Sequence, residues 1–131
     1  MKKAFEELVT TLCALKELGA PAPYIGGSPF DVDGSMCTLI YNALVNRDQF
    51  FLYVVFGYAP RDKEALVFER LLQKNLLEVD GRAPRFCLSA NTGKVGCVIS
   101  LGLADTTADQ LAGSLAYHAN KAAEWRETFF L

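Results

Sequence analysis

Apolar residues recur at helical spacing in three segments, at about residues 2–18, 62–77 and 107–129. Positions three, four and seven apart share one face of an α-helix, so each segment predicts a helix with an apolar face. Gly19 follows the first segment as a stop signal, Asp62 is placed to cap the second, and Thr107 with Gln110 fits a capping box that starts the third. The second segment carries a belt wider than one core-facing stripe: Ala65, Leu66, Val67, Phe68, Leu71, Leu72, Leu76 and Leu77.

Shorter apolar segments predict five β-strands, at about residues 30–32, 36–44, 50–58, 85–90 and 95–101. Asp33-Gly34 and the segment Asn91-Thr92-Gly93-Lys94 predict tight turns, because glycine adopts positive φ without strain. The run from Phe50 to Phe56 is apolar at every position, whereas a strand with one face in water alternates. This strand therefore requires cover on both faces.

The element order α-β-β-β-α-β-β-α predicts an α+β fold, with a mostly antiparallel five-stranded sheet packed against three helices. No linker or repeat interrupts the chain, so we expect a single domain over residues 1–131. Three helices can cover one face of such a sheet. The other face, and the broad belt of the second helix, would then be buried by a second subunit or a bound chain. An ordinary compact monomer whose helices wrap both faces is the alternative.

Composition narrows the class of protein. Apolar residues make up 51% of the chain and charged residues 21%, which excludes general disorder. Thirteen basic and 15 acidic residues give a formal charge of −2, which argues against a nucleic-acid binder. Residues 50–56 form the longest apolar run, far below the roughly 20 residues that cross a membrane. Glu6 and Glu7 fall where a secretory signal needs apolar residues, so we expect a cytoplasmic protein that contacts no membrane.

Side chains that carry chemistry do not form a recognisable site. The four cysteines, Cys13, Cys37, Cys87 and Cys97, include no C-x-x-C pair, and we expect each to be a buried, reduced thiol. His118 lies at helical spacing between apolar residues, which favours a packed side chain over a catalytic one. We therefore predict no metal, no cofactor and no enzymatic activity. A small-molecule-binding or enzymatic α+β domain remains the alternative function.

Two short motifs fall short of known binding loops. The segment Asp31-Val32-Asp33-Gly34-Ser35 has the opening spacing of a calcium loop but lacks the later acidic ligands. Gly93-Lys94 lacks the upstream glycine and the following Ser or Thr of a phosphate loop. Both segments are better explained as turns between strands.

The segment Leu71-Leu72-Gln73-Lys74-Asn75-Leu76-Leu77 resembles the Leu-Leu-x-x-Asn-Leu signature of the class I type III secretion chaperones, the Tir-chaperone family of small acidic bacterial proteins. A strand pair around Gly93 and a last helix that ends near Trp125 follow, as in that family. The opening segment Phe5-Glu6-Glu7-Leu8-Val9 also fits its first helix. The resemblance extends over nearly the whole chain.

This resemblance implies a homodimer in the bacterial cytoplasm that uses no nucleotide. It implies a client, the non-globular N-terminal segment of a secreted effector, and makes a secretion ATPase a further candidate partner. The implied dimer contacts are Val67, Phe68, Leu71, Leu72, Phe86 and Leu88.

An extended client can add to an open strand edge while apolar pockets take its alternate side chains. The first helix and the early strands would form one such pocket. The candidate effector-binding residues are Phe5, Leu8, Leu12, Phe30, Val32, Leu39 and Tyr41. Some members of this set are expected to belong to the core instead. A regulator that docks on another protein through the same surface is a further reading of these residues.

Overall fold

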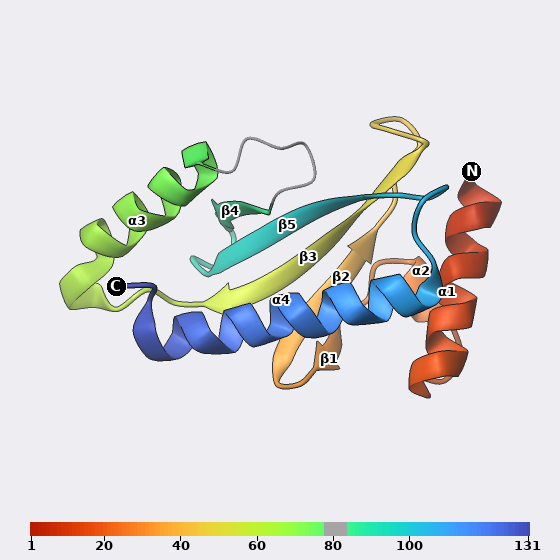
Figure 1. Cartoon of the computed structure of the whole chain (residues 1–131), viewed down its shortest axis with the longest axis horizontal. Helices are drawn as coiled ribbons and strands as arrows, with labels where there is room; N and C mark the ends of the chain where they lie inside the picture. The colour runs from red at the N-terminus through yellow and green to blue at the C-terminus, as the bar shows by residue number, and fades with distance from the viewer. Residues whose placement is uncertain (78–83) are drawn as a thin grey trace.

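The computed structural model describes residues 1–77 and 84–131, apart from the side chain of Leu77, which belongs to the predicted apolar belt (Figure 1). Its helices and strands, in chain order, are α1 (Lys2–Lys16), α2 (Ala22–Ile25), β1 (Phe30–Val32), β2 (Ser35–Ile40), β3 (Gln49–Gly57), the 3-10 turn η1 (Arg61–Lys63), α3 (Glu64–Leu77), β4 (Arg85–Leu88), β5 (Val95–Gly102) and α4 (Ala108–Thr128). The strands form one antiparallel sheet in the order β1-β2-β3-β5-β4. The predicted α+β fold with a five-stranded sheet is confirmed.

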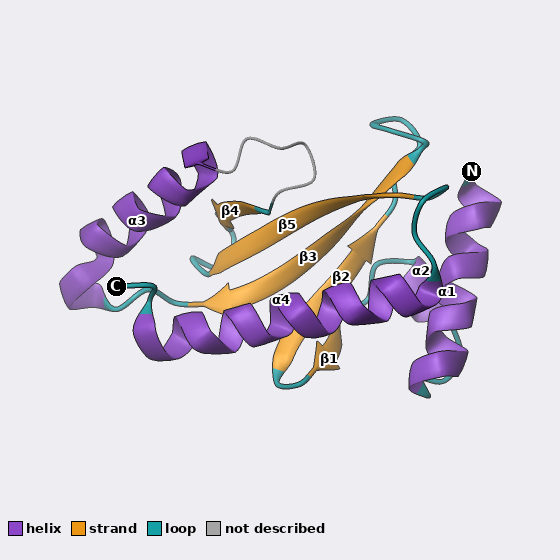
Figure 2. Ribbon diagram, in the orientation of Figure 1, coloured by secondary structure: helices purple, strands orange, loops and turns teal. Residues whose placement is uncertain are grey.

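One face of the sheet carries the hydrophobic core. Along β3 buried and half-buried residues alternate, so that Phe50, Leu52, Val54 and Phe56 are buried. The long helix α4 crosses this face (Figure 2), and α1 packs beside it, where Phe5 lies against Phe50 with ring centroids 5.7 Å apart. Side chains from α1, α4 and the sheet thus share one apolar interior.

Helix α4 is fixed at both ends by polar contacts. The main-chain N–H of Gln110 donates to Thr107 Oγ1 at 3.1 Å, and the main-chain N–H of Thr107 donates to Gln110 Oε1 at 3.0 Å. This pair of bonds confirms the predicted capping box. Near the C-terminus, the Arg126 guanidinium donates to the Phe56 carbonyl at 3.2 Å and to Ser35 Oγ at 2.9 Å. These contacts hold α4 to β2 and β3.

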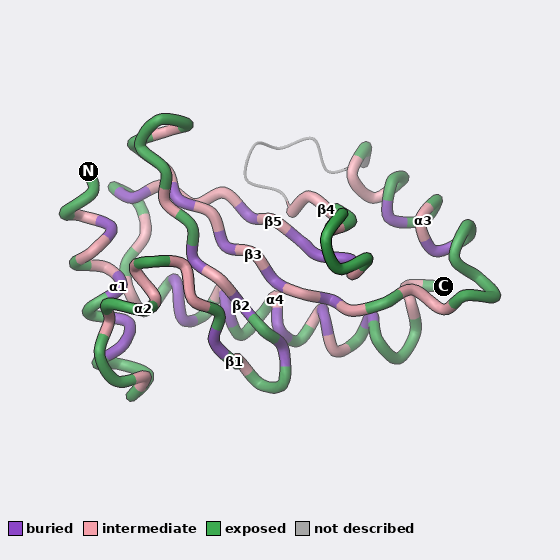
Figure 3. The backbone as a smooth tube through the Cα atoms, turned by 180° about the vertical axis from the view of Figure 1, so that it is seen from behind, coloured by how far each residue is buried: buried purple, intermediate pink, exposed green. Residues whose placement is uncertain are grey.

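The opposite face of the sheet is only partly covered. Phe51, Tyr53 and Val55 are half-buried, while Met36 and Ile40 are 40% and 44% exposed. Seen from behind, the strands lie in front of α4 (Figure 3). The sequence predicts that this strand requires cover on both faces. In the structure, one face of β3 lies in the core and the other face is only partly covered.

The position of α3 corrects the expectation that three helices cover one face. Helix α3 lies beside β4, at the edge of the sheet, and packs on η1 and β4 (Figures 1 and 3). Val67 and Leu71 are buried, whereas Leu72 and Leu76 are 68% and 74% exposed. Only part of the predicted apolar belt is therefore covered by this chain.

Several element boundaries differ from the sequence prediction. Helix α1 ends at Lys16 rather than Leu18, because Glu17 adopts a left-handed conformation with φ of 54°. Strand β2 ends at Ile40 rather than Leu44, because Asn42 turns the chain and accepts a hydrogen bond from the Leu44 N–H at 3.0 Å. The sequence predicts no element between residues 18 and 30, where the structure has the short helix α2, and the helical turn that follows Pro60 starts as the 3-10 turn η1 rather than with Asp62 as the N-cap. Strand β4 ends at Leu88, two residues early.

Candidate binding surfaces at the two edges of the sheet

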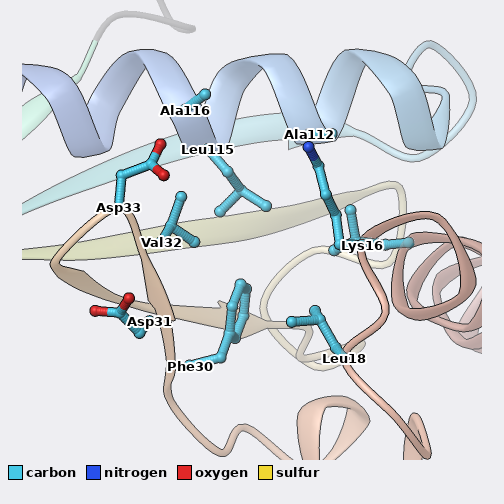
Figure 4. A pocket seen from close by; sticks show the side chains of 10 residues that line it. Lys16, Leu18, Phe30, Asp31, Val32, Asp33, Ala112, Leu115 and Ala116 are labelled. Atoms are coloured by element: carbon cyan, nitrogen blue, oxygen red, sulfur yellow. The ribbon is translucent and has the colours of Figure 1, made fainter.

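A groove of about 180 Å³ lies beside the edge strand β1, which we name the β1 groove. It is formed by the end of α1, by β1 and by the N-terminal half of α4 (Figure 4), and its lining residues are Leu12, Lys16, Leu18, Phe30, Asp31, Val32, Asp33, Ala112, Leu115 and Ala116. Its walls thus come from segments more than 90 positions apart in the chain.

A tight turn positions β1. Asp33 and Gly34 both have positive φ, 49° and 90°, which is the geometry of a two-residue type I′ hairpin. Val32 pairs with Ser35 across this turn, and Phe30 pairs with Cys37. Because hydrogen-bonded positions alternate along an antiparallel pair, the N–H and C=O of Asp31 point away from β2, toward the edge of the sheet. An extended chain laid along this edge can bond to both groups.

Charged side chains surround the apolar floor of the β1 groove. The carboxylates of Asp31 and Asp33 lie on the β1 side, and Lys16 lies on the α1 side (Figure 4). Asp31 also accepts a hydrogen bond from the Gly34 N–H at 3.3 Å, which supports the turn. The groove therefore offers an apolar site with acid on one rim and a base on the other.

The predicted effector-binding residues separate into two groups. Phe5, Leu12, Phe30 and Leu39 are buried, with at most 5% of each side chain exposed, and Leu8, Val32 and Tyr41 are half-buried. The structure brings Leu12, Phe30 and Val32 together in the β1 groove. Tyr41 instead stacks on Phe5, with ring centroids 5.3 Å apart. Their role in binding a client stays a prediction.

Sequence reasoning missed the far wall of the β1 groove. Ala112 and Ala116 come from α4, Lys16 is the last residue of α1, and Leu18 follows that helix. Small residues at helical spacing give no signal of a groove, because their importance arises only where another element passes close to them. The acidic pair Asp31 and Asp33 was visible in the sequence, but only as part of an incomplete calcium loop.

A second groove, of about 230 Å³, lies between α3 and β4, and we name it the α3 groove. Its lining is almost entirely apolar: Phe68, Leu71, Leu72, Asn75, Phe86, Cys87, Leu88 and Val95. The structure thus brings together all of the predicted dimer contacts except Val67, which is completely buried. Leu72 and Leu88 are 68% and 54% exposed, so this end of the molecule presents apolar side chains to solvent. The dimer itself stays a prediction.

Asn75 is the polar residue of the α3 groove. Its Oδ1 accepts from the Phe86 N–H at 2.8 Å, and its Nδ2 donates to the Phe86 carbonyl at 3.1 Å. One side-chain amide therefore satisfies both main-chain groups of a residue in the edge strand. The sequence motif contained this asparagine, but its bonding partner could not be inferred from the motif.

One cysteine departs from the prediction of four buried thiols. Cys13, Cys37 and Cys97 are buried, but Cys87 is exposed, because it lies on the short edge strand β4. Desolvation raises the pKa of the Cys87 thiol, and a hydrogen bond with the Gly96 backbone partly opposes this. Burial raises the pKa of the Cys37 thiol to about 12, with a further contribution from the Asp31 carboxylate. Neither environment favours a reactive thiolate.

His118 lies in a third groove, of about 230 Å³, where its burial lowers its pKa. The charged groups of this groove already have partners, since Lys121 pairs with Glu124 at 3.3 Å and the Lys74 ammonium lies 4.8 Å from the Phe130 ring centroid. The groove is smaller than the roughly 300–1,000 Å³ typical of small-molecule sites. Within the described residues, His, Cys, Asp and Glu form no group of three that could bind a metal. The described helices also include none with the length and apolar character needed to span a membrane.

A small α+β domain with two apolar grooves at opposite edges of its sheet defines a protein-binding module, and the comparisons narrow it further. The family described as Tir chaperone protein (CesT) matches residues 28–126, so the chain belongs to this chaperone family. The resemblance found in the sequence is thereby confirmed. No curated protein sequence matches the chain.

Three solved structures are similar to this one. A chain of the Yersinia pestis type III secretion chaperone SycH in complex with a fragment of YscM2 is 20% identical, with a TM-score of 0.65 over 92% of this chain and 98% of that chain. A chain of the ExsC–ExsE complex is 18% identical, with a TM-score of 0.75 over 98% and 96%. A chain of the HopA1–SchA chaperone–effector complex is 14% identical, with a TM-score of 0.71 over 97% and 96%. At these identities the likeness establishes the fold.

Proposed function

We propose that this chain is a dimeric, nucleotide-independent chaperone that binds the non-globular N-terminal segment of a type III secreted effector and keeps it soluble and competent for secretion. The observation that carries the proposal is the β1 groove beside an open strand edge. Membership of the Tir chaperone family supports it, as does the similarity to chaperones solved in complex with their partners. We place the protein in the bacterial cytoplasm, without enzymatic activity, and a secretion ATPase is a further candidate partner.

The chemistry of the β1 groove suits an extended peptide. A client strand beside β1 gains main-chain hydrogen bonds at Asp31, and one of its apolar side chains enters the space between Leu12, Phe30 and Leu115. Burial contributes about 25 cal/mol per Å² of apolar surface, while ordering an unfolded client opposes a large share of that gain. The client can therefore bind without folding and can be released.

The α3 groove suits a second copy of the same chain. Leu72, Leu76 and Leu88 are more than half exposed, and Leu72 and Leu88 line the groove. An exposed apolar patch rimmed by polar residues marks an interaction site in proteins of this size. A two-fold contact would bury α3 of one protomer against α3 and β4 of its partner.

The client site is tested by blocking the β1 groove without touching the core. Ala116 is exposed and lines the groove, so Ala116→Glu would introduce a charged side chain into the client's position. Asn120→Glu, one turn along the same helix on an exposed position outside the groove, is the matched control. The measurement is co-purification from the native cytoplasm, with mass spectrometry and limited proteolysis of the bound protein. We expect wild type and Asn120→Glu to retain an effector through a protease-sensitive N-terminal segment, and Ala116→Glu to lose it. Equal retention by Ala116→Glu would refute the assignment.

A second pair of variants tests the client site and the proposed dimer site independently. Leu8→Asp is expected to lose the client while the dimer persists, since Leu8 is half-buried on α1 one helical turn before Leu12, which lines the β1 groove. Leu72→Asp is expected to give monomers, because it charges the exposed face of α3. Light scattering gives the mass of each, and circular dichroism reports whether each is folded. If Leu8→Asp unfolds the protein, the stripe on α1 belongs to the core instead.

A further inference from the structure

The edge strand β4 would be open to pairing if nothing covered it. Within the sheet β4 has one neighbour, β5, with Phe86 opposite Cys97. Beyond the end of β4, the Ser89 N–H donates to the Lys94 carbonyl at 2.9 Å, so alternate residues of this segment face β5. The main-chain groups of Phe86 therefore point away from the sheet, and unpaired groups of this kind recruit other extended chains.

Helix α3 occupies this position through Asn75. Its amide accepts from the Phe86 N–H at 2.8 Å and donates to the Phe86 carbonyl at 3.1 Å, the two bonds that a neighbouring strand would form. Gln73, two residues earlier on the same helix, is exposed, and its Nε2 donates to Glu69 Oε1 at 3.5 Å. The bond to the strand is thus specific to the face of α3 that carries Asn75.

We infer that Asn75 is a positioning residue that fixes α3 on the edge of β4 and thereby builds the α3 groove. The groove has one wall from α3, with Phe68 and Leu72, and one wall from β4, with Phe86 and Leu88. Asn75 joins these walls by its hydrogen bonds to Phe86, although the two residues are eleven positions apart in the chain. The identity of the partner that docks on the finished groove, a second copy of the chain, rests on the proposed function. The contact between α3 and β4 does not.

The amide pair also explains why the two edges of the sheet bind different partners. At β1 the main-chain groups of Asp31 face the edge, whereas at β4 those of Phe86 are bonded to a helix. An extended chain is therefore directed to β1. A partner at β4 meets apolar side chains held at a defined distance by Asn75.

The test compares Asn75→Ala with Gln73→Ala, a matched substitution on a different face of α3. Native-state amide exchange by NMR is measured in the Leu72→Asp background, which removes self-association at the proposed interface. We expect exchange at the Phe86 amide to accelerate about tenfold or more in Asn75→Ala and to stay unchanged in Gln73→Ala. Equal exchange at Phe86 in the two variants would overturn the inference, whatever the oligomeric state.

A second variant keeps the test decisive if Asn75→Ala fails to fold. Asn75→Asp keeps the acceptor for the Phe86 N–H but presents a carboxylate oxygen to the Phe86 carbonyl, so only one of the two bonds survives. We expect the Phe86 amide to stay protected while the amides of α3 exchange faster than in Gln73→Ala. Unchanged exchange in α3 would show that the reciprocal bond does not position the helix.

Sedimentation equilibrium on the chain without Leu72→Asp tests whether the hydrogen bonds between Asn75 and Phe86 also support dimerisation. Asn75→Ala is expected to raise the dimer dissociation constant about tenfold, and Gln73→Ala to leave it unchanged. If the wild-type chain is monomeric, the proposed interface fails, and the exchange experiment alone still decides the role of Asn75. If the dimer is unaffected by Asn75→Ala, the positioning role is refuted while dimerisation stands.

Discussion

The two edges of this sheet are finished in opposite ways. At the β1 edge a two-residue turn leaves a short strand with its outward main-chain groups beside an apolar groove and three charged side chains, Lys16, Asp31 and Asp33. At the β4 edge a helix is bonded to the strand through Asn75, and exposed leucines take the place of charges. One sheet thus offers a strand partner at one edge and an apolar surface at the other.

This difference teaches which physical feature selects each kind of partner. An unfolded chain can satisfy main-chain groups at an edge, so it is bound where such groups are free and where a groove takes single side chains. A folded partner brings its own satisfied backbone, so it is bound where side chains alone are presented. Under the proposed function, the β1 edge binds the extended client and the β4 edge binds a folded copy of the chain.

The largest difference between the two edges is expected in the free energy of unfolding, when one aromatic side chain is removed from each edge in separate variants. Phe30 at β1 is 5% exposed, so Phe30→Ala is expected to lower the free energy of unfolding by about 3–5 kcal/mol. Phe86 at β4 is half-buried, within 5.5 Å of the Phe56 ring and 6.2 Å of the Phe130 ring, so Phe86→Ala should cost clearly less in a monomer. Urea unfolding of both variants in the Leu72→Asp background measures the difference. Equal losses of unfolding free energy would mean that Phe86 is packed within a single chain as fully as Phe30.

Thiol labelling should give a smaller effect that separates the same two ends. Cys13, on the α1 side, is 3% exposed, whereas Cys87 lines the α3 groove. We expect a maleimide to label Cys87 first, slowly at neutral pH because its pKa is raised, and faster as the pH rises. Labelling should be about tenfold faster in Leu72→Asp than in wild type, since the proposed dimer covers the groove. Mass spectrometry of peptides identifies the site, and labelling of Cys13 at the same rate would contradict the assigned burial.

The smallest effect concerns the charges on the rim of the β1 groove. Asp33→Asn preserves the left-handed turn, because asparagine tolerates φ near 49°, and removes only the negative charge. A client that carries a basic residue beside its apolar anchor should bind a few-fold more weakly, as expected for about 0.2–1 kcal/mol at an exposed charge pair. Asp62→Asn, on the exposed turn η1, is the control. Isothermal titration with the client's N-terminal peptide should show the difference at low salt and lose it at high salt. A difference that persists at high salt would exclude an electrostatic origin.

Local sequence signals predicted most of the elements correctly. The three long helices, the positions of the five strands along the chain, the turns at Gly34 and Gly93 and the capping box at Thr107 all depend on residues a few positions apart. Hydrophobic spacing also located residues that line both grooves, among them Leu12 and Leu72. It did not distinguish a groove residue from a core residue: Phe5 and Leu12 share one stripe of α1 and both are buried, yet of the two Leu12 alone lines a groove.

The sequence by itself determined the periodicity of each element, the excess of apolar side chains and the membership of a chaperone family. Only the tertiary structure decided that α3 lies beside the sheet rather than on its face, that α4 supplies the far wall of the β1 groove, and that Asn75 bonds to Phe86. The physical reason is distance along the chain. A helix or a turn is stabilised by neighbours three or four residues away, whereas a groove and a closed edge exist only after remote segments have packed together.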